Sequence, residues 1–294
     1  MTDDQPSPDP EAETETDPLA LAYDRALTRE KAGDALGAAE AWREVLALDP
    51  ADHGGAAVRL AALGAAADPD RASPAYVATL FDQHAASFED ILVGKLGYRA
   101  PERLAQLIEA TGGNRDADGD GTLALLDLGC GTGLMAAALG PRAGHATGVD
   151  LSEEMLGEAD ERELYDELYV GDAVAFLHAP AEDEDGDVAG PWDLICAADV
   201  LPYLGALEDL FSGVFAQLHP GGRFAFSTET LSPAAFDGRP WRIGPHQRFH
   251  HSETYIRDGL AAAGFEILVV EDWVIRTNLG DPEPGHLVVA RRPA

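Results

Sequence analysis

The chain is poor in lysine, and this shortage narrows what it can bind. Lys31 and Lys95 are its only lysines in 294 residues, whereas 53 residues are acidic and the formal net charge is −33. A surface of that charge repels nucleic-acid phosphates and anionic membranes. We therefore expect neither nucleic acid nor a membrane among its partners. An acid excess with so few lysines is also typical of proteins adapted to high salt.

Cysteines and long apolar runs are equally scarce. The two cysteines, Cys130 and Cys196, lack the spacing of metal ligands and favour a reducing compartment. The sequence contains no run of 18 apolar residues, so no transmembrane helix is predicted. Segment 1–18 is acidic and contains prolines, which is not typical of a signal peptide. We therefore predict a cytoplasmic protein.

A glycine-rich turn at residues 129–133 is the most informative feature that the chain does contain. The apolar sequence Leu-Leu-Asp-Leu precedes the turn, Gly-Cys-Gly-Thr-Gly forms it, and a helix-like segment at 134–139 follows. This order is typical of a buried parallel strand that leads into a helix through a turn close to a ligand. A dinucleotide-binding turn follows the pattern G-x-G-x-x-G, whereas here Asp127 precedes the turn. A carboxylate at this position suits a ligand with an ammonium group and repels a pyrophosphate.

Acidic residues also close the strands that follow. Asp150 ends a second apolar run, where it can accept hydrogen bonds from two ribose hydroxyls. Asp172 ends a third run, where it can reach an adenine amino group, and Asp199 follows a fourth. A Pro-Gly-Gly turn then introduces a fifth strand. These acids predict one ligand site at the carboxyl edge of a parallel sheet.

Together these motifs resemble those of the class I S-adenosylmethionine-dependent methyltransferases. The elements D-x-G-C-G-T-G, G-V-D-L-S, G-D-A and L-x-P-G-G follow one another between about residues 127 and 292. The resemblance implies an α/β fold with a doubly wound, mostly parallel, seven-stranded Rossmann-like sheet whose last strand is antiparallel. It also implies S-adenosylmethionine as the cofactor, bound by Asp127, Gly129, Cys130, Gly131, Gly133, Asp150, Leu151, Asp172, Ala173 and Asp199.

Two helices with apolar periodicity are expected near the N-terminus, at 19–33 and 35–48. Gly33, Ala38, Trp42 and Pro50 match positions of the tetratricopeptide-repeat pattern, so that this region resembles one such repeat. An isolated repeat buries too little surface to be stable alone. We therefore expect it to pack on a neighbouring part of the chain, with self-association or a protein partner as alternatives.

The chain divides into four predicted parts. These are a disordered acidic tail at 1–18, the tetratricopeptide-like helical region at 19–68, a helical connector and cofactor lid at 69–122, and the methyltransferase domain at 123–294. The connector carries the pattern Y-V-x-x-L-F-D-x-H-A-x-x-F, which resembles a subgroup of repeat-containing methyltransferases. Tyr76, Phe81, His84 and Phe88 are therefore candidate lid residues, and Tyr76 and Phe88 are expected to contact the substrate. The alternative is an aromatic face that packs on the core.

Two acidic segments, 114–121 and 182–187, are expected to be surface insertions before the first and fourth strands. The first matches the opening of a calcium-binding loop, in which the twelfth position must be an acid that binds the metal through both oxygens. Here that position is Asp127, which has a short side chain and belongs to a predicted strand. We therefore expect no metal.

A long connection at 230–252 is the most basic part of the chain and the expected place of substrate choice. Its arginines and histidines favour a small anionic acceptor, held by Arg242, Arg248 and His251. A base is needed only when the acceptor atom carries a proton with a high pKa. Candidates for such a group are His84, Asp199, Tyr203 and His250. No N-P-P-Y motif follows the fourth strand, which argues against methylation of base amines.

The sequence therefore predicts methyl transfer to an oxygen or nitrogen of a small, anionic molecule. Two alternatives stay open. The chain can be a non-catalytic scaffold with a methyltransferase fold, or a protein methyltransferase whose repeat region recruits the target.

Overall fold

The computed structural model describes residues 17–112, 122–179, 190–244, 246–278 and 280–294. The predicted insertions at 114–121 and 182–187 lie outside the described residues, as does the acidic tail up to residue 16. Asp17 and Pro18, which we placed in the disordered tail, are ordered instead. Asp17 caps the first helix by accepting a hydrogen bond from Leu19 N, and Pro18 is its first residue.

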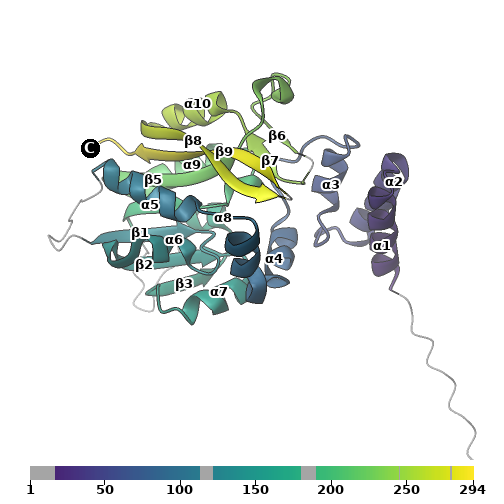
Figure 1. Cartoon of the computed structure of the whole chain (residues 1–294), viewed down its shortest axis with the longest axis horizontal. Helices are drawn as coiled ribbons and strands as arrows, with labels where there is room; N and C mark the ends of the chain where they lie inside the picture. Colours follow the sequence, from purple (N-terminus) through teal and green to yellow (C-terminus); the bar gives the residue numbers. More distant parts are fainter. Residues whose placement is uncertain (1–16, 113–121, 180–189, 245, 279) are drawn as a thin grey trace, which may run out of the picture.

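A mostly parallel sheet forms the centre of the molecule (Figure 1). Five strands are mutually parallel and lie in the order β3-β2-β1-β4-β5, and the last strand, β9, is antiparallel to β5 and pairs with β8 on its other side. This arrangement confirms the predicted α/β fold with an antiparallel last strand. The strand bounds are β1 (Leu123–Leu128), β2 (Ala143–Asp150), β3 (Glu167–Val170), β4 (Trp192–Ala197), β5 (Leu218–Glu229), β8 (Glu266–Asn278) and β9 (Asp281–Arg291).

Two further strands occur where the sequence predicted an irregular connection. β6 (Trp241–Ile243) and β7 (Phe249–His251) form an antiparallel pair, and β7 joins the carboxyl end of β5 through Glu229 and His250. The Trp241 and Phe249 rings pack edge to face with their centroids 5.6 Å apart. The sheet therefore has nine strands in the described residues, rather than the seven expected.

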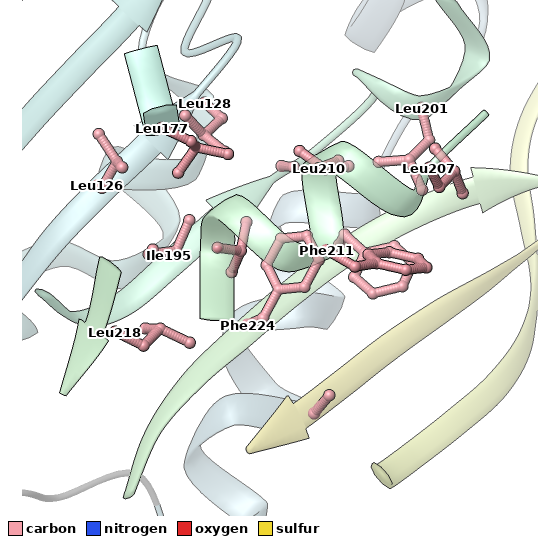
Figure 2. Close-up of a cluster of buried hydrophobic side chains, with 14 of the residues drawn as sticks. Leu126, Leu128, Leu177, Ile195, Leu201, Leu207, Leu210, Phe211, Leu218 and Phe224 are labelled. Atoms are coloured by element: carbon pink, nitrogen blue, oxygen red, sulfur yellow. The ribbon is translucent and has the colours of Figure 1, made fainter. Parts of the chain in front are cut away.

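Helices cover both faces of the sheet because the apolar side chains of its strands alternate between them. Leu126 and Leu128 point to the face covered by α8, α9 and α10, where they join a cluster with Leu177 and Phe211 (Figure 2). Leu125 points to the opposite face, beneath α5 and α6. The bounds are α5 (Ala100–Ala110), α6 (Leu134–Leu139), α7 (Glu153–Asp160), α8 (Ala173–His178), α9 (Glu208–Gln217) and α10 (Glu253–Ala263).

The N-terminal helices lie to one side of the sheet (Figure 1). A small core of their own surrounds Trp42, whose ring nitrogen donates to Glu30 Oε2 at 2.8 Å. The helices are α1 (Pro18–Lys31), α2 (Ala35–Leu48) and α3 (Ala56–Ala62), and the connector continues with α4 (Pro74–Asp82), η1 (Ala85–Ser87) and the π-helical η2 (Asp90–Lys95). Their assignment to a tetratricopeptide repeat stays a prediction. In the part of the chain that the structure describes, no helix is long and apolar enough to cross a membrane.

Candidate active site

A pocket opens at the carboxyl ends of the strands, where the order of the sheet reverses between β1 and β4. Open α/β sheets bind ligands at such a reversal. The pocket brings together acids from four strand ends, the glycine turn and side chains from the connector. Residues predicted for the cofactor that line it are Asp127, Gly129, Cys130, Gly131, Asp150, Leu151, Asp172, Ala173 and Asp199.

The glycine turn forms the floor of the pocket and requires glycine for two reasons. Gly129 and Gly131 have φ values of +62° and +54°, in the left-handed region that other residues seldom adopt. A Cβ atom on Gly129 would lie 2.4 Å from Val200 Cγ2, so the backbone is close to its neighbours. Gly133, also predicted for the cofactor, is buried at the start of α6 and is not part of the pocket lining.

Asp150 links the turn to the second strand. Its carboxylate accepts hydrogen bonds from Gly131 N and Ser152 N, both at 2.9 Å. Burial raises the pKa of Asp150 above its usual value. A carboxylate has about four acceptor positions, and these two bonds leave two for a ligand. That capacity matches two neighbouring hydroxyl groups.

Asp127 is buried at the end of β1, with 1% of its surface exposed. Tyr165 donates its hydroxyl hydrogen to Asp127 Oδ2 at 2.7 Å, a partner that the sequence did not predict. Burial raises the pKa of Asp127 to about 7, although the Tyr165 hydrogen bond acts in the opposite direction. A cationic ligand group beside this carboxylate favours its ionised form.

The high pKa of Asp127 predicts that ligand affinity depends on pH. Below about pH 7 the free protein holds Asp127 protonated, so a ligand ammonium group must first displace that proton. We expect the affinity for S-adenosylhomocysteine to fall up to ~10-fold for each pH unit below 7 and to level off above it. Calorimetric titrations between pH 5.5 and 8.5 measure this dependence. Asp127→Asn should remove the part of this dependence that is centred near pH 7, and a wild-type affinity that is independent of pH would contradict the role of Asp127.

Asp172 lies at the far end of the pocket and interacts with a residue that precedes α4 in the chain. Its carboxylate caps α8 by accepting from Ala175 N at 2.9 Å. Both terminal nitrogens of Arg71 also contact it, with Arg71 Nη1 at 3.3 Å from Oδ1 and Arg71 Nη2 bonded to Oδ2. Leu151 and Ala173 line the pocket beside this pair. No motif in the sequence points to Arg71.

The connector covers the glycine turn. Glu89 Oε1 accepts from Thr132 Oγ1 at 2.7 Å, and Glu89 also forms an ion pair with Arg162 at 2.9 Å. Phe88 lines the pocket near the turn and also packs against the core beneath α5 and α6, so that its role as a lid residue stays a prediction. Tyr76 is not among the lining residues and packs against Gly55 instead, which lies just before α3.

A buried cluster of charges stands behind the pocket. Asp199 has a φ of +69°, unusual for a residue with a side chain, and its carboxylate binds the guanidinium groups of Arg248 and Arg276. Both arginines also contact Glu229, which is 1% exposed. Arg248 donates in addition to the Tyr203 hydroxyl at 2.9 Å. Two positive charges therefore face two negative ones.

The predicted anion-binding loop does not converge on the pocket. Arg242 donates to the carbonyl oxygen of Ala235 at 2.6 Å, and Arg248 is engaged in the buried cluster. His251 is fully buried between Thr228 and the carbonyl of Leu204, and burial lowers its pKa to about 3.

Of the four candidate catalytic groups, two line the pocket and two do not. His250 is buried beside Glu229, and burial lowers its pKa. His84 is exposed, and neither histidine lines the pocket. Asp199 and Tyr203 do line it.

Comparison with known sequences identifies the domain that carries this pocket. Residues 96–270, more than half of the chain, match the family described as a methyltransferase domain. The chain belongs to this family. The match begins before β1 and includes the glycine turn and all four acids of the pocket.

Curated relatives of this methyltransferase domain include ubiquinone biosynthesis O-methyltransferases. The protein of that name from Aromatoleum aromaticum is 32% identical over 104 residues, which is 35% of this chain and 43% of the relative. The one from Aeromonas salmonicida is 26% identical over 112 residues, 38% of this chain and 45% of the relative. The chain thus matches less than half the length of these relatives.

Solved structures show the same fold. The N-methyltransferase NodS from Bradyrhizobium japonicum, in complex with S-adenosylhomocysteine, has a TM-score of 0.52 and 18% identity, over 74% of this chain and 99% of the other. The magnesium protoporphyrin IX methyltransferase from Synechocystis, with bound S-adenosylmethionine, has a TM-score of 0.51 and 18% identity, over 74% and 96%.

Proposed function

We propose that this methyltransferase domain binds S-adenosylmethionine in the pocket and transfers its methyl group to a small molecule. The observation that carries the proposal is the meeting of a glycine turn with four strand-end carboxylates in one pocket. S-adenosylmethionine has a positive charge at sulfur and another at its amino group. Asp172 and Asp199 are paired with arginines, so the attraction comes from the carboxylates of Asp127 and Asp150, which line the same pocket.

The residues present fit this cofactor at three places. Asp127 holds the amino group, Asp150 accepts from the two ribose hydroxyls, and Asp172 with Leu151 surrounds the adenine. Gly129 and Gly131 line the pocket without side chains, which leaves room for the methionine half. When bound, the sulfonium supplies an already activated methyl group, so that the protein mainly has to align the acceptor.

The acceptor binds in the apolar part of the pocket. Phe81, Phe88, Leu92, Tyr98 and Tyr203 line this part, and the Phe81 ring lies 5.5 Å from that of Tyr203 and 5.9 Å from that of Phe88. Such a lining favours a molecule with an apolar or aromatic body. Methyl transfer takes place on an oxygen or nitrogen of that molecule. We do not retain an anionic acceptor held by Arg242 and Arg248, because neither arginine is available in the pocket.

The chain contributes orientation more than proton removal. Burial raises the pKa of Tyr203 to about 12, so Tyr203 stays neutral, and its oxygen already accepts a hydrogen bond from Arg248. Its own hydrogen is then left to donate to an acceptor. Asp199 cannot act as a free base while two guanidinium groups hold its carboxylate. This suits acceptors that are nucleophilic near neutral pH.

Transfer of a labelled methyl group tests the proposal. The full chain is incubated with methyl-labelled S-adenosylmethionine and a cell extract, at low and at molar salt, and the label is followed in small-molecule and protein fractions. We expect label in the small-molecule fraction, and none when Asp150→Ala replaces the wild type. Label in the protein fraction alone would favour a protein methyltransferase. Tight cofactor binding without any transfer would favour a scaffold.

A further inference from the structure

The adenine end of the pocket is closed by a residue that precedes the catalytic core. Arg71 belongs to the connector, 101 positions before Asp172 in sequence, and its guanidinium forms a two-pronged ion pair with that carboxylate. A planar guanidinium matches the two oxygens of a carboxylate and fixes its orientation. Arg71 and Asp172 both line the pocket, next to Ala72 and Ala173.

Asp172 retains the capacity to accept one more hydrogen bond. Its Oδ1 atom accepts from Ala175 N and from Arg71, whereas Oδ2 accepts from Arg71 alone. Since each carboxylate oxygen has two acceptor positions, one position on Oδ2 stays available for a ligand N–H group. Arg71 therefore orients the carboxylate and leaves it one acceptor position for a ligand.

Arg71 also differs in charge and bonding from the rest of the pocket. Among the described residues that line it, Arg71 carries a positive charge, whereas Asp127, Asp150, Asp172 and Asp199 are acids. Its Nε atom is buried and has no hydrogen-bond partner within the described part of the chain. A buried donor without an acceptor is costly, and an acceptor atom of a ligand removes that cost.

The backbone around Arg71 is held in place on the catalytic domain. Ala72 N donates to the carbonyl oxygen of Tyr203 at 2.9 Å, and Gly205 N donates to that of Asp70 at 2.8 Å. Arg71 itself pairs with Leu204 in an isolated bridge. These bonds fix Arg71 from both sides, so its position is not that of a loosely attached surface residue.

From this geometry we propose that Arg71 is a cofactor-site residue that positions Asp172 for the adenine and closes that end of the pocket. The inference rests on the proposed function, because it assigns the ligand of the pocket as adenosine-containing. It makes the connector, and not only the catalytic domain, part of the cofactor site.

Two ligands and two variants test the assignment in the full chain. S-adenosylhomocysteine contains both halves of the cofactor, whereas 5′-methylthioadenosine lacks the amino acid group. We expect Arg71→Ala to lower the affinity for both ligands by the same factor, about 10- to 100-fold, because Arg71 acts on the adenosine half that the two ligands share. Asp127→Asn should weaken S-adenosylhomocysteine and leave 5′-methylthioadenosine unchanged. Calorimetry supplies the dissociation constants.

The way in which Arg71 acts is tested by a double-mutant cycle. If Arg71 works through Asp172, the losses in Arg71→Ala and Asp172→Ala are not additive in the double variant. Arg71→Lys keeps the positive charge but cannot donate two parallel hydrogen bonds to the carboxylate, so it should recover only part of the affinity. Arg239→Ala is the matched control, because it removes an exposed ion pair with Asp68 outside the pocket.

The outcomes separate the inference from the proposed function. If the wild type binds neither ligand, the proposed function fails, whatever Arg71 does. If the wild type binds both and folded Arg71→Ala binds them equally well, the role of Arg71 is overturned while the cofactor site stands. Additive losses in the double-mutant cycle would overturn its action through Asp172. Circular dichroism of each variant establishes that it is folded.

Discussion

Asp150→Ala is expected to lower the affinity for S-adenosylhomocysteine by about 100- to 1,000-fold. The change removes a carboxylate that has two acceptor positions for the ribose hydroxyls, and each charge-assisted hydrogen bond contributes about 1.5–3 kcal/mol. It also removes the acceptor for Gly131 N and Ser152 N, which hold the glycine turn and the start of α7. The glycine turn then loses a contact that shapes the floor of the pocket.

Calorimetry near pH 8 is the appropriate measurement. Burial raises the pKa of Asp127 to about 7 and also raises that of Asp150, and both carboxylates must be ionised in the wild type. Asp160→Ala is the matched control, since Asp160 is an exposed acid at the end of α7 and does not line the pocket. We expect the control to bind like the wild type. An unchanged dissociation constant in folded Asp150→Ala would overturn the assignment of this residue to the ribose.

The sheet and its acidic strand ends were predictable because local sequence determines them. Leu126 and Leu128 alternate with Asp127 in a short run before glycines, and that pattern alone predicts a buried strand followed by a turn. The carboxyl ends of parallel strands meet at one edge, so acids from separate strands had to come together. The structure places Asp127, Asp150, Asp172 and Asp199 in one pocket as this rule requires.

Partners that lie far apart in sequence were not predictable in the same way. Tyr165 donates to Asp127 across 38 positions, and Arg71 reaches Asp172 across 101. No periodicity or motif connects such pairs, since only the packed fold brings them together. Nothing in the sequence singled out Arg71 either, because the connector also contains Lys95, Arg99 and Arg103.

In the basic loop at 230–252, by contrast, residues that are close in sequence do not act together. Arg242 and Arg248 lie near each other in the chain, and the sequence therefore predicted that both would bind an anionic acceptor. Arg248 is in fact matched by Glu229, at the end of β5, and by Asp199, which follows β4. Whether an arginine in a folded protein is available to a ligand depends on the residues that surround it. The acids that neutralise Arg248 come from other strands.

A substitution in the buried cluster of Arg248, Arg276, Asp199 and Glu229 is expected to have the largest effect on stability. Glu229→Ala is expected to lower the free energy of unfolding by about 3–5 kcal/mol, the usual cost of removing one partner from a buried ion pair. Glu229 contacts Arg248 Nε at 2.9 Å and Arg276 Nη2 at 3.3 Å, and is 1% exposed. Without it, two buried guanidinium groups share the single carboxylate of Asp199, and an uncompensated positive charge remains behind the pocket.

Urea unfolding at neutral pH measures this loss, with Glu253→Ala as the matched control. Glu253 forms an exposed pair with Arg257, with both side chains 46% exposed, and such pairs contribute at most about 1 kcal/mol. If both variants lost equally little, Arg248 and Arg276 would not depend on Glu229. Asp199, which binds both guanidinium groups, would then be sufficient to neutralise them, and the stabilising role assigned to Glu229 would be overturned.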